Sequence, residues 1–209
     1  MSKKDRIQGV YAITDPIAGR GEELLNHVRQ ALEGGVRVLQ YRDKSGARTR
    51  QQTESRALLQ LCESYQATFI INDNVELAAE IGAHGVHIGK SDAALEKARE
   101  RLGADAIIGV SCYNQLQLAK EAAQAGADYV AFGRFFASRT KPDAMQADVK
   151  VLTQAKAELS LPVVAIGGIT PENGGQLIEH GADALAIIQG IFAQTDIRVA
   201  AQRHAALFQ

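Results

Sequence analysis

The sequence is dominated by one repeat, in which a short apolar run rich in β-forming residues is followed by a longer segment with helical spacing. Predicted strands cover residues 9–14, 36–42, 68–72, 85–89, 106–111, 128–133, 162–167 and 184–188. Segments between them, such as 22–33, 49–65, 115–124 and 172–179, have one apolar face, which predicts amphipathic helices. Several of these segments end at a glycine that leads directly into the next strand, as at Gly82, Gly126 and Gly181. The repeat therefore predicts eight βα units.

Eight βα units in 209 residues leave about 26 residues for each unit, which favours a compact barrel of parallel strands. A doubly wound open sheet is the competing topology, and it usually carries a glycine-rich phosphate loop after its first strand. Here that loop reads Thr14-Asp-Pro-Ile-Ala-Gly-Arg20, which matches neither common fingerprint. No linker or shift in composition divides the chain. We therefore predict an α/β fold, a single (β/α)8 TIM barrel that forms one catalytic domain over residues 1–209.

Charge and composition limit the partners of the protein and its compartment. The 23 Lys and Arg residues oppose 24 Asp and Glu residues, and this near-neutral balance argues against nucleic acid as a partner. The apolar stretches 161–169 and 182–193 are shorter than the roughly 18 to 20 residues that span a bilayer, and no apolar leader follows the charged N-terminus. Cys62 and Cys112 form no metal or redox motif, so we expect them to be reduced and buried. We expect a cytoplasmic protein that acts on small molecules, with no membrane partner; whether it forms a homo-oligomer stays open.

Polar side chains gather where the second predicted strand ends, and in a (β/α)8 barrel the carboxyl ends of the strands form the rim of the active site. The two-residue period of a strand places Gln40, Arg42 and Lys44 on one face. Leu39 and Tyr41 then face the helices. A solvated sheet edge is the alternative, but a closed barrel has no free edge strand. We therefore predict that the three polar side chains lie at the mouth of the barrel and bind substrate.

Two carboxylates follow adjacent predicted strands and indicate a metal site. Asp73 comes directly after Asn72 at the end of the third strand, and Asp92 follows the fourth. Each carboxylate could instead cap the helix behind it. The cations expected at the same rim are Arg42, Lys44 and Lys141. This set favours Mg²⁺ bound to a polyanionic ligand, because Mg²⁺ takes one or two carboxylates and fills its octahedron with water and phosphate oxygens.

The other rim loops supply small hydrogen-bond donors. Ser111 ends the fifth strand, and since no histidine partner is evident in the sequence we do not predict it to be a nucleophile. The loop 133–142 is long enough to form a lid with hydroxyl and cationic donors. After the last two strands, Gly168 and the pair Gln189-Gly190 would let backbone N–H groups approach a phosphate. His87 could carry a proton inside the barrel, although a hydrogen-bonded core histidine is the favoured interpretation.

Read in order, the rim residues resemble the thiamine-phosphate synthase family over nearly the whole chain. The matching segments are Tyr11-Ala-Ile-Thr-Asp15, Gln40-Tyr-Arg-Asp-Lys44, Ile71-Asn-Asp73, Gly85-Val-His-Ile-Gly89 with Asp92, Gly109-Val-Ser111, Gly126-Ala-Asp-Tyr-Val130, Thr140-Lys141 and Ile166-Gly-Gly-Ile-Thr170. The ordered set is highly specific, whereas its glycine-rich elements alone occur in many barrels. The sequence departs from the commonest family pattern at Lys90, Arg134, Ala137-Ser138 and Gln189-Gly190.

The resemblance implies a transferase that joins 4-amino-5-hydroxymethyl-2-methylpyrimidine diphosphate to 4-methyl-5-(2-hydroxyethyl)thiazole phosphate and releases pyrophosphate. It also implies that Asp73 and Asp92 hold Mg²⁺ as the cofactor. The residues implied to surround the diphosphate are Arg42, Lys44, Asn72 and Lys141. Those implied to contact the pyrimidine and the leaving group are Gln40 and Ser111, with Ser138 and Thr140 in the lid. Those implied at the thiazole phosphate are Gly168, Gln189 and Gly190, and the catalytic set is Arg42, Lys44, Ser111 and Lys141.

The chemistry of the rim suits this reaction. A diphosphate leaves more readily when a metal and cations neutralise its growing charge, and the aminopyrimidine delocalises the positive charge left on its methylene group. The thiazole nitrogen then attacks with its own lone pair, so no protein nucleophile is required. We expect a magnesium-assisted dissociative substitution that depends on positioning. Two alternatives are a thiazole tautomerase, which lacks the full diphosphate and metal set, and a non-catalytic ligand-binding or regulatory relative.

Overall fold

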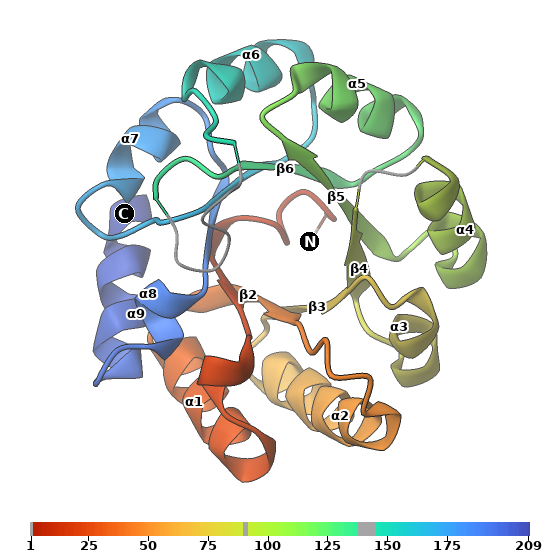
Figure 1. The fold of residues 1–209 in the computed structure, drawn as a ribbon, viewed down its shortest axis with the longest axis vertical. Coiled ribbons are helices and arrows are strands. Elements are labelled where there is room, and N and C mark those ends of the chain that lie inside the picture. The colour runs from red at the N-terminus through yellow and green to blue at the C-terminus, as the bar shows by residue number, and fades with distance from the viewer. Residues whose placement is uncertain (1, 90–91, 138–144) are drawn as a thin grey trace.

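The computed structural model describes residues 2–89, 92–137 and 145–209, and these form a closed parallel barrel (Figure 1). The strands are β1 (Gly9–Ile13), β2 (Val36–Tyr41), β3 (Thr68–Asn72), β4 (Gly85–Ile88), β5 (Ile107–Tyr113), β6 (Tyr129–Gly133), β7 (Val163–Ile166) and β8 (Ala184–Ile187). Each strand pairs in parallel with the next one in sequence, and β8 returns to pair with β1. The predicted (β/α)8 barrel is therefore confirmed, and the open-sheet alternative is wrong.

Helices surround the strands as an outer ring, which Figure 1 shows from one end of the barrel. They are α1 (Gly21–Glu33), α2 (Arg48–Ser64), α3 (Val75–Ile81), α4 (Asp92–Leu102), α5 (Leu116–Gln124), α6 (Lys150–Glu158), α7 (Gly174–Glu179), α8 (Gln189–Phe192) and α9 (Ile197–Ala205), with short 3₁₀ turns at Pro16–Ala18 and Ala206–Phe208. Helix α3 ends as the sequence predicts, because Gly82 takes the left-handed conformation with φ of 69°. The chain then turns into β4.

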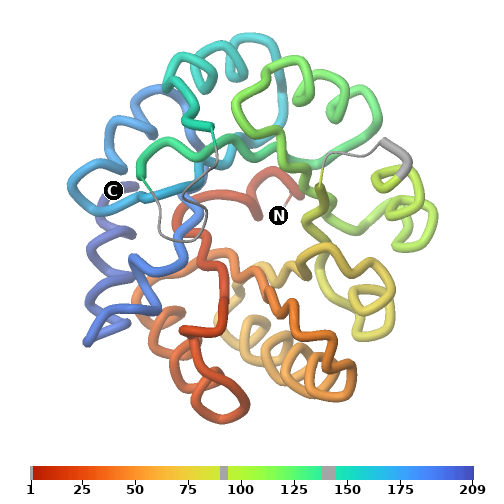
Figure 2. Tube along the Cα trace, viewed as in Figure 1, coloured from red at the N-terminus to blue at the C-terminus, as the bar shows by residue number. Residues whose placement is uncertain are grey.

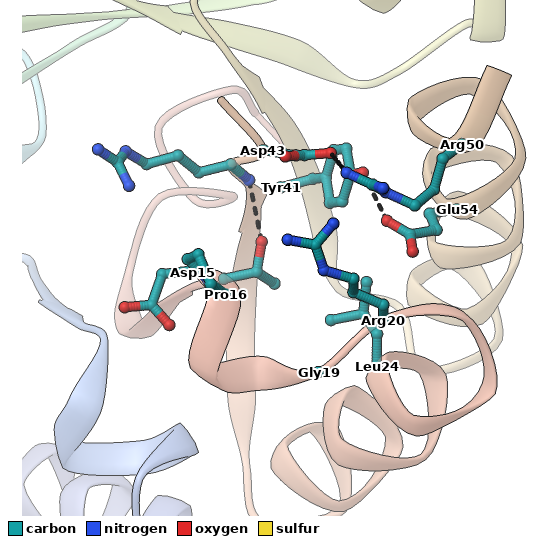
Figure 3. Close-up of a pocket in the computed structure, with 11 residues that line it drawn as sticks. Asp15, Pro16, Gly19, Arg20, Leu24, Tyr41, Asp43, Arg50 and Glu54 are labelled. Atoms are coloured by element: carbon teal, nitrogen blue, oxygen red, sulfur yellow. Dashed lines mark hydrogen bonds and ion pairs between the residues drawn. The ribbon is translucent and has the colours of Figure 1, made fainter. Parts of the chain in front are cut away.

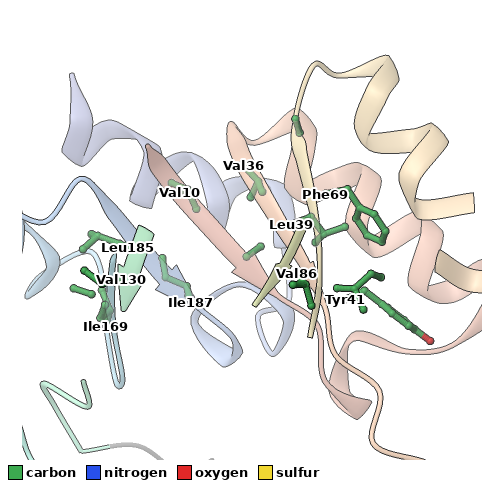
Figure 4. Packing of buried hydrophobic residues seen from close by; sticks show 14 of the residues in the cluster. Val10, Val36, Leu39, Tyr41, Phe69, Val86, Val130, Ile169, Leu185 and Ile187 are labelled. Atoms are coloured by element: carbon green, nitrogen blue, oxygen red, sulfur yellow. The ribbon is translucent and has the colours of Figure 1, made fainter. Parts of the chain in front are cut away.

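The two faces of the barrel wall have separate apolar clusters. Side chains such as Val10, Leu39 and Phe69 point outward and pack under the helices (Figure 4). Val38, Ile70 and their neighbours point inward and form a smaller cluster within the barrel. The predicted alternation of β2 is confirmed, since Leu39 and Tyr41 belong to the outer cluster whereas Val38 belongs to the inner one.

The segment before β1 covers the amino-terminal end of the barrel. Ile7 is fully buried in the inner cluster, and the carbonyl of Arg6 accepts a hydrogen bond from Thr68, the first residue of β3. Lys3 forms an ion pair with Asp128, just before β6, at 3.1 Å. Figure 2 shows the N-terminal part of the chain within the ring of strands. One end of the barrel is therefore filled, so a ligand must enter from the other end.

Cys62 and Cys112 are free and buried, as predicted, and burial raises the pKa of the Cys112 thiol to about 12. Among the described residues, no helix is both long enough and apolar enough to cross a membrane.

Candidate active site

A cavity of about 590 Å³ opens within the barrel and among the loops that follow its strands. The predicted site residues that line it are Gln40, Arg42, Asn72, Ser111, Gly168, Gln189 and Gly190. They come from β2, β3 and β5 and from the ends of β7 and β8, so residues far apart in sequence meet around one volume. The lining also has an apolar side, with Ile13, Val164 and Ile166. A cavity of this size and mixed character is typical of a small-molecule site.

Other predicted site residues are not part of this lining. Lys44 is exposed on the loop after β2 and does not line the cavity as the described residues define it. Ser138, Thr140 and Lys141 fall in the segment 138–144, which lies outside the described residues. Asp92 is the first residue of α4, and its side chain is likewise outside the description. Of the residues that depart from the family pattern, Arg134, Ala137, Gln189 and Gly190 line the cavity.

The loop that carries Arg42 and Lys44 is fastened to α2. Asp43 forms an ion pair with Arg50 at 2.9 Å, and the backbone amide of Arg42 donates to Thr14 Oγ1 at 2.9 Å. Burial alone would raise the pKa of Asp43, but hydrogen bonds from the Ser45 amide and from Arg50 lower it below its usual range. Asp43 therefore stays ionised, which keeps the loop anchored beside the cavity.

A second anchor lies beneath this loop, in a small crevice between α1, β2 and α2 (Figure 3). The hydroxyl of Tyr41 donates to Glu54 at 2.7 Å, and the same carboxylate accepts the backbone N–H of Gly21 at 2.8 Å. Burial and the neighbouring Glu54 raise the pKa of Tyr41, so its hydroxyl stays neutral and remains a donor. The outward-facing residue of β2 thus fixes the strand that presents Gln40 inward.

Asp73 lies at the rim with an exposed side chain. Its backbone has φ of 60°, in the left-handed region that few residues other than glycine adopt, and its N–H donates to the carbonyl of His87 at 2.8 Å. Its carboxylate accepts a hydrogen bond from the Asn72 amide at 2.7 Å. The suggestion that Asp73 caps α3 is wrong, because Asn74 is the capping residue and accepts the N–H of Leu77. The carboxylate of Asp73 is therefore available at the rim.

Among the described residues, carboxylates do not form a complete metal cage. Among the side chains that the structure describes, which do not include that of Asp92, no three from His, Cys, Asp or Glu come together that could hold an ion. Mg²⁺ does not require such a cage, because it retains several waters and binds through one or two carboxylates plus substrate oxygens. The exposed carboxylate of Asp73 has the chemistry of such a ligand.

Inside the barrel, five side chains from five strands form a continuous hydrogen-bond network. Gln40 Nε2 lies 2.8 Å from the hydroxyl of Tyr11, which lies 2.8 Å from the hydroxyl of Tyr129. That second hydroxyl lies 3.0 Å from His87 Nδ1, and His87 Nε2 lies 2.8 Å from Ser111 Oγ. We call Gln40, Tyr11, Tyr129, His87 and Ser111 the interior network. The interpretation of His87 as a hydrogen-bonded histidine agrees with these contacts, although His87 also lines the cavity.

The network corrects one interpretation of the sequence, because Ser111 does have a histidine partner. That pair nevertheless differs from a Ser-His-Asp triad at its third member. The ring of His87 is held by Tyr129, whose pKa is raised well above its usual value by burial and by the adjacent Tyr11. A neutral hydroxyl cannot stabilise an imidazolium as a buried carboxylate does. Ser111 is therefore placed as a hydrogen-bonding group, in line with the expectation that it is not a nucleophile.

Sequence reasoning did not single out Tyr11 and Tyr129 as site residues. Both lie at inward positions of their strands and both line the cavity. Gly109 makes room for the second ring, since a Cβ at Gly109 would lie 1.9 Å from Cζ of Tyr129. Strand periodicity could have identified the inward tyrosines, but only the barrel shows that their hydroxyls meet. Further lining residues that were missed are Tyr113, Thr170 and Gln194.

A closed (β/α)8 barrel, filled at the amino-terminal end and with a cavity of mixed polar and apolar lining among the loops after its strands, is typical of barrel enzymes that act on small molecules. The fold and the site therefore place the protein in the general class of (β/α)8-barrel enzymes that act on small molecules.

Comparison with known proteins identifies the family. Residues 10–191 match the family model described as thiamine monophosphate synthase, and the chain belongs to that family. It is 54% identical over 195 residues to a thiamine-phosphate synthase from Nitrosococcus oceani, covering 93% of this chain and 90% of that protein. It is 49% identical over 207 residues to a thiamine-phosphate synthase from Alcanivorax borkumensis, covering 98% of this chain and 95% of that protein. The solved structure of a thiamine phosphate pyrophosphorylase from Pyrococcus furiosus is similar with a TM-score of 0.87 and 31% identity, covering 98% of this chain and 96% of that one.

Proposed function

We propose that this chain is the transferase that joins the aminopyrimidine diphosphate to the thiazole phosphate, forming thiamine phosphate and pyrophosphate. The observation that carries this proposal is the meeting of Gln40, Arg42, Asn72 and Ser111 around one cavity in a member of the thiamine monophosphate synthase family. The tautomerase and the non-catalytic relative are less well supported, because relatives about half identical over nearly the whole chain are named as synthases. Residues 1–209 would form one catalytic domain.

Within this proposal the diphosphate lies at the side of the cavity formed by β2 and β3. The guanidinium of Arg42 and the amide of Asn72 would bind its oxygens, and Lys44 and Lys141 would add positive charge from the loops. Gln40 and Ser111 would orient the pyrimidine and the leaving group, while Ser138 and Thr140 would contact substrate from the lid. Gly168 and Gln189-Gly190 line the part of the cavity that follows β7 and β8, where the thiazole phosphate would bind.

Asp73 and Asp92 are the proposed magnesium ligands. The carboxylate of Asp73 is exposed and does not cap α3, which supports this role. When bound, Mg²⁺ would offset negative charge on the departing diphosphate. The positively charged side chains of the protein would offset the same negative charge. The cavity would hold the thiazole nitrogen near the pyrimidine methylene and limit access of water. Bond breaking then precedes attack, as in a dissociative substitution.

The direct test mixes the purified protein with both substrates and Mg²⁺ and follows thiamine phosphate and pyrophosphate together. We expect the two products to form in equal amounts and to disappear when the metal is chelated. If a folded protein binds the thiazole phosphate but makes neither product, the tautomerase or binding-protein alternative becomes the better explanation.

The metal role of Asp73 has its own test. Asp73→Asn should raise the Mg²⁺ concentration that gives half-maximal rate by about tenfold or more, because a charged ligand is replaced by a neutral one. Asp105→Asn is the matched control, since Asp105 is exposed before β5 at the opposite end of the barrel. Equal Mg²⁺ dependence in the two variants would remove Asp73 from the metal site.

A further inference from the structure

When the histidine ring is neutral and both buried tyrosine hydroxyls donate within the network, the interior network can order its protons in only two ways. Each tyrosine hydroxyl has one proton to donate, and a neutral imidazole donates from one nitrogen and accepts at the other. The distances along the network, 2.8, 2.8, 3.0 and 2.8 Å, require a proton in every link. The direction of the first link therefore sets the direction of all the others.

In the first arrangement the amide nitrogen of Gln40 faces Tyr11, as the structure has it. Because that nitrogen can only donate, Tyr11 accepts from it. The proton of the buried Tyr11 hydroxyl is then donated to Tyr129, its other partner in the network. Tyr129 then donates to Nδ1 of His87. The ring proton lies on Nε2 and is donated to Ser111, whose hydroxyl proton remains to be donated into the cavity.

In the second arrangement the amide of Gln40 is turned over, so that its oxygen faces Tyr11. An amide oxygen can only accept, and every link therefore reverses. Ser111 now donates to Nε2 of His87 and offers only lone pairs to the cavity. Apart from the exchange of Oε1 and Nε2 in the Gln40 amide, the heavy atoms need not move between the two arrangements. Whether Ser111 donates to a ligand or accepts from it is thus decided at Gln40, on the other side of the barrel.

We propose that Tyr11, Tyr129 and His87 are positioning residues that couple the two ends of the cavity through this proton order. A ligand group that donates to the Gln40 carbonyl would hold the amide in the first arrangement, and Ser111 would then donate to an anionic oxygen. Links in such a network polarise one another, so the two ends strengthen together.

The ligand class follows from the two ends. It carries a hydrogen-bond donor, such as an amino group, at Gln40 and an anionic oxygen, such as that of a phosphate, at Ser111. The aminopyrimidine diphosphate has both groups, so this inference deepens the proposed function and rests on it for the identity of the ligand. The proton order itself is a property of the protein and can be measured without turnover.

The first experiment determines the tautomer of His87 by ¹⁵N NMR of the full chain labelled at histidine. The chain has five histidines, and His87→Gln identifies the signals of His87 by their loss. We expect the proton on Nε2 in the unaltered protein. Gln40→Glu, measured at pH 9, presents a carboxylate that only accepts and should move the proton to Nδ1. Tyr129→Phe interrupts the network, so Gln40→Glu in that background should leave the tautomer unchanged.

The opposite outcomes overturn the proposal. An unaltered tautomer in Gln40→Glu would mean that the first link does not control the last. A proton shift that persists in the Tyr129→Phe background would mean that charge acts through space and not through the network. Tyr11→Phe is the second interruption, to be used if the first variant fails to fold.

The second experiment measures coupling by the affinity of the pyrimidine diphosphate, with Mg²⁺ and without thiazole phosphate. Gln40→Leu and Ser111→Ala are combined in a double-mutant cycle, and we expect their losses in affinity to deviate from independence by about tenfold. In the Tyr129→Phe background the losses should multiply independently. Tyr65→Phe is the matched control, because Tyr65 is an exposed tyrosine just after α2, and it should preserve the coupling.

The two proposals fail in different ways. Normal synthesis of thiamine phosphate with independent effects of Gln40 and Ser111 would contradict the coupling and keep the function. A tautomer that responds to Gln40→Glu in a protein that makes no thiamine phosphate would do the reverse.

Discussion

Arg42 combines a backbone fixed to the loop after β1 with a side chain that is proposed to bind the diphosphate. Its backbone amide donates to Thr14, and the residue lines the cavity. Arg42→Ala should lower kcat at saturating substrates by about 10²- to 10³-fold, as for loss of one donor that stabilises developing charge. The measurement is steady-state release of pyrophosphate. Arg29→Ala removes an exposed arginine from α1 and should leave kcat unaltered, whereas unchanged turnover in Arg42→Ala would refute the assignment.

Gly109 is important because it has no side chain and so leaves room for the ring of Tyr129. A Cβ at this position would lie 1.9 Å from Cζ and 2.4 Å from the hydroxyl oxygen of Tyr129, so the ring must shift. Gly109→Ala should lower the free energy of unfolding by about 1–3 kcal/mol, the usual cost of overpacking. Urea unfolding followed by circular dichroism measures this. Gly175→Ala, where a Cβ meets nothing within 4 Å, should be neutral or stabilising.

At the scale of elements, His84 ties β3 to the turn before β4. Its Nδ1 accepts the backbone N–H of Phe69 at 2.9 Å, which requires that nitrogen to be unprotonated, and burial lowers the pKa of His84 below its ordinary value of 6.5. The unfolded chain therefore takes up the proton first as pH falls. This contribution to stability is complete above about pH 6.5 and decreases as pH drops below it.

His84→Asn tests this link, because it retains an acceptor without a titrating group. Between pH 7.5 and 5.5 the free energy of unfolding should fall less steeply in this variant than in the unaltered protein. His180→Asn is the control: His180 Nδ1 donates to the carbonyl of Gln176, so protonation does not break its bond. Identical slopes for the unaltered protein and His84→Asn would show that His84 does not contribute to the pH dependence.

The helices and strands also show how accurately the sequence predicted the fold. Strand bounds were correct to within one or two residues, because most strands are short apolar runs buried on both faces of the barrel wall and bounded by polar or glycine-containing segments. The sequence offered Asp73 as a possible cap of α3, but the neighbouring Asn74 caps this helix. Adjacent residues that can both cap cannot be distinguished by pattern alone, since the choice depends on backbone angles.

At the scale of the whole molecule, the barrel depends on the segment that fills its amino-terminal end. Ile7 is fully buried in the inner cluster, although it precedes the first strand. Ile7→Ala should reduce the free energy of unfolding by about 2–5 kcal/mol, through lost burial and a residual cavity. Equilibrium unfolding in urea provides the value. Ile17→Ala is the matched control, since Ile17 is 48% exposed, and it should change stability by no more than about 0.5 kcal/mol. Equal effects would indicate that the end of the barrel is filled by other groups.

The sequence by itself determined the βα repeat, the closed barrel and the family, because these depend on periodicity and on an ordered set of rim motifs. It also identified Gln40, Arg42, Asn72 and Ser111, whose positions at or near strand ends are local properties. Only the tertiary structure decided that Ser111 meets His87 and that Tyr11 joins Gln40 to Tyr129. Those contacts depend on strand stagger and on the space left by Gly109, and both arise only when the eight strands close around one interior.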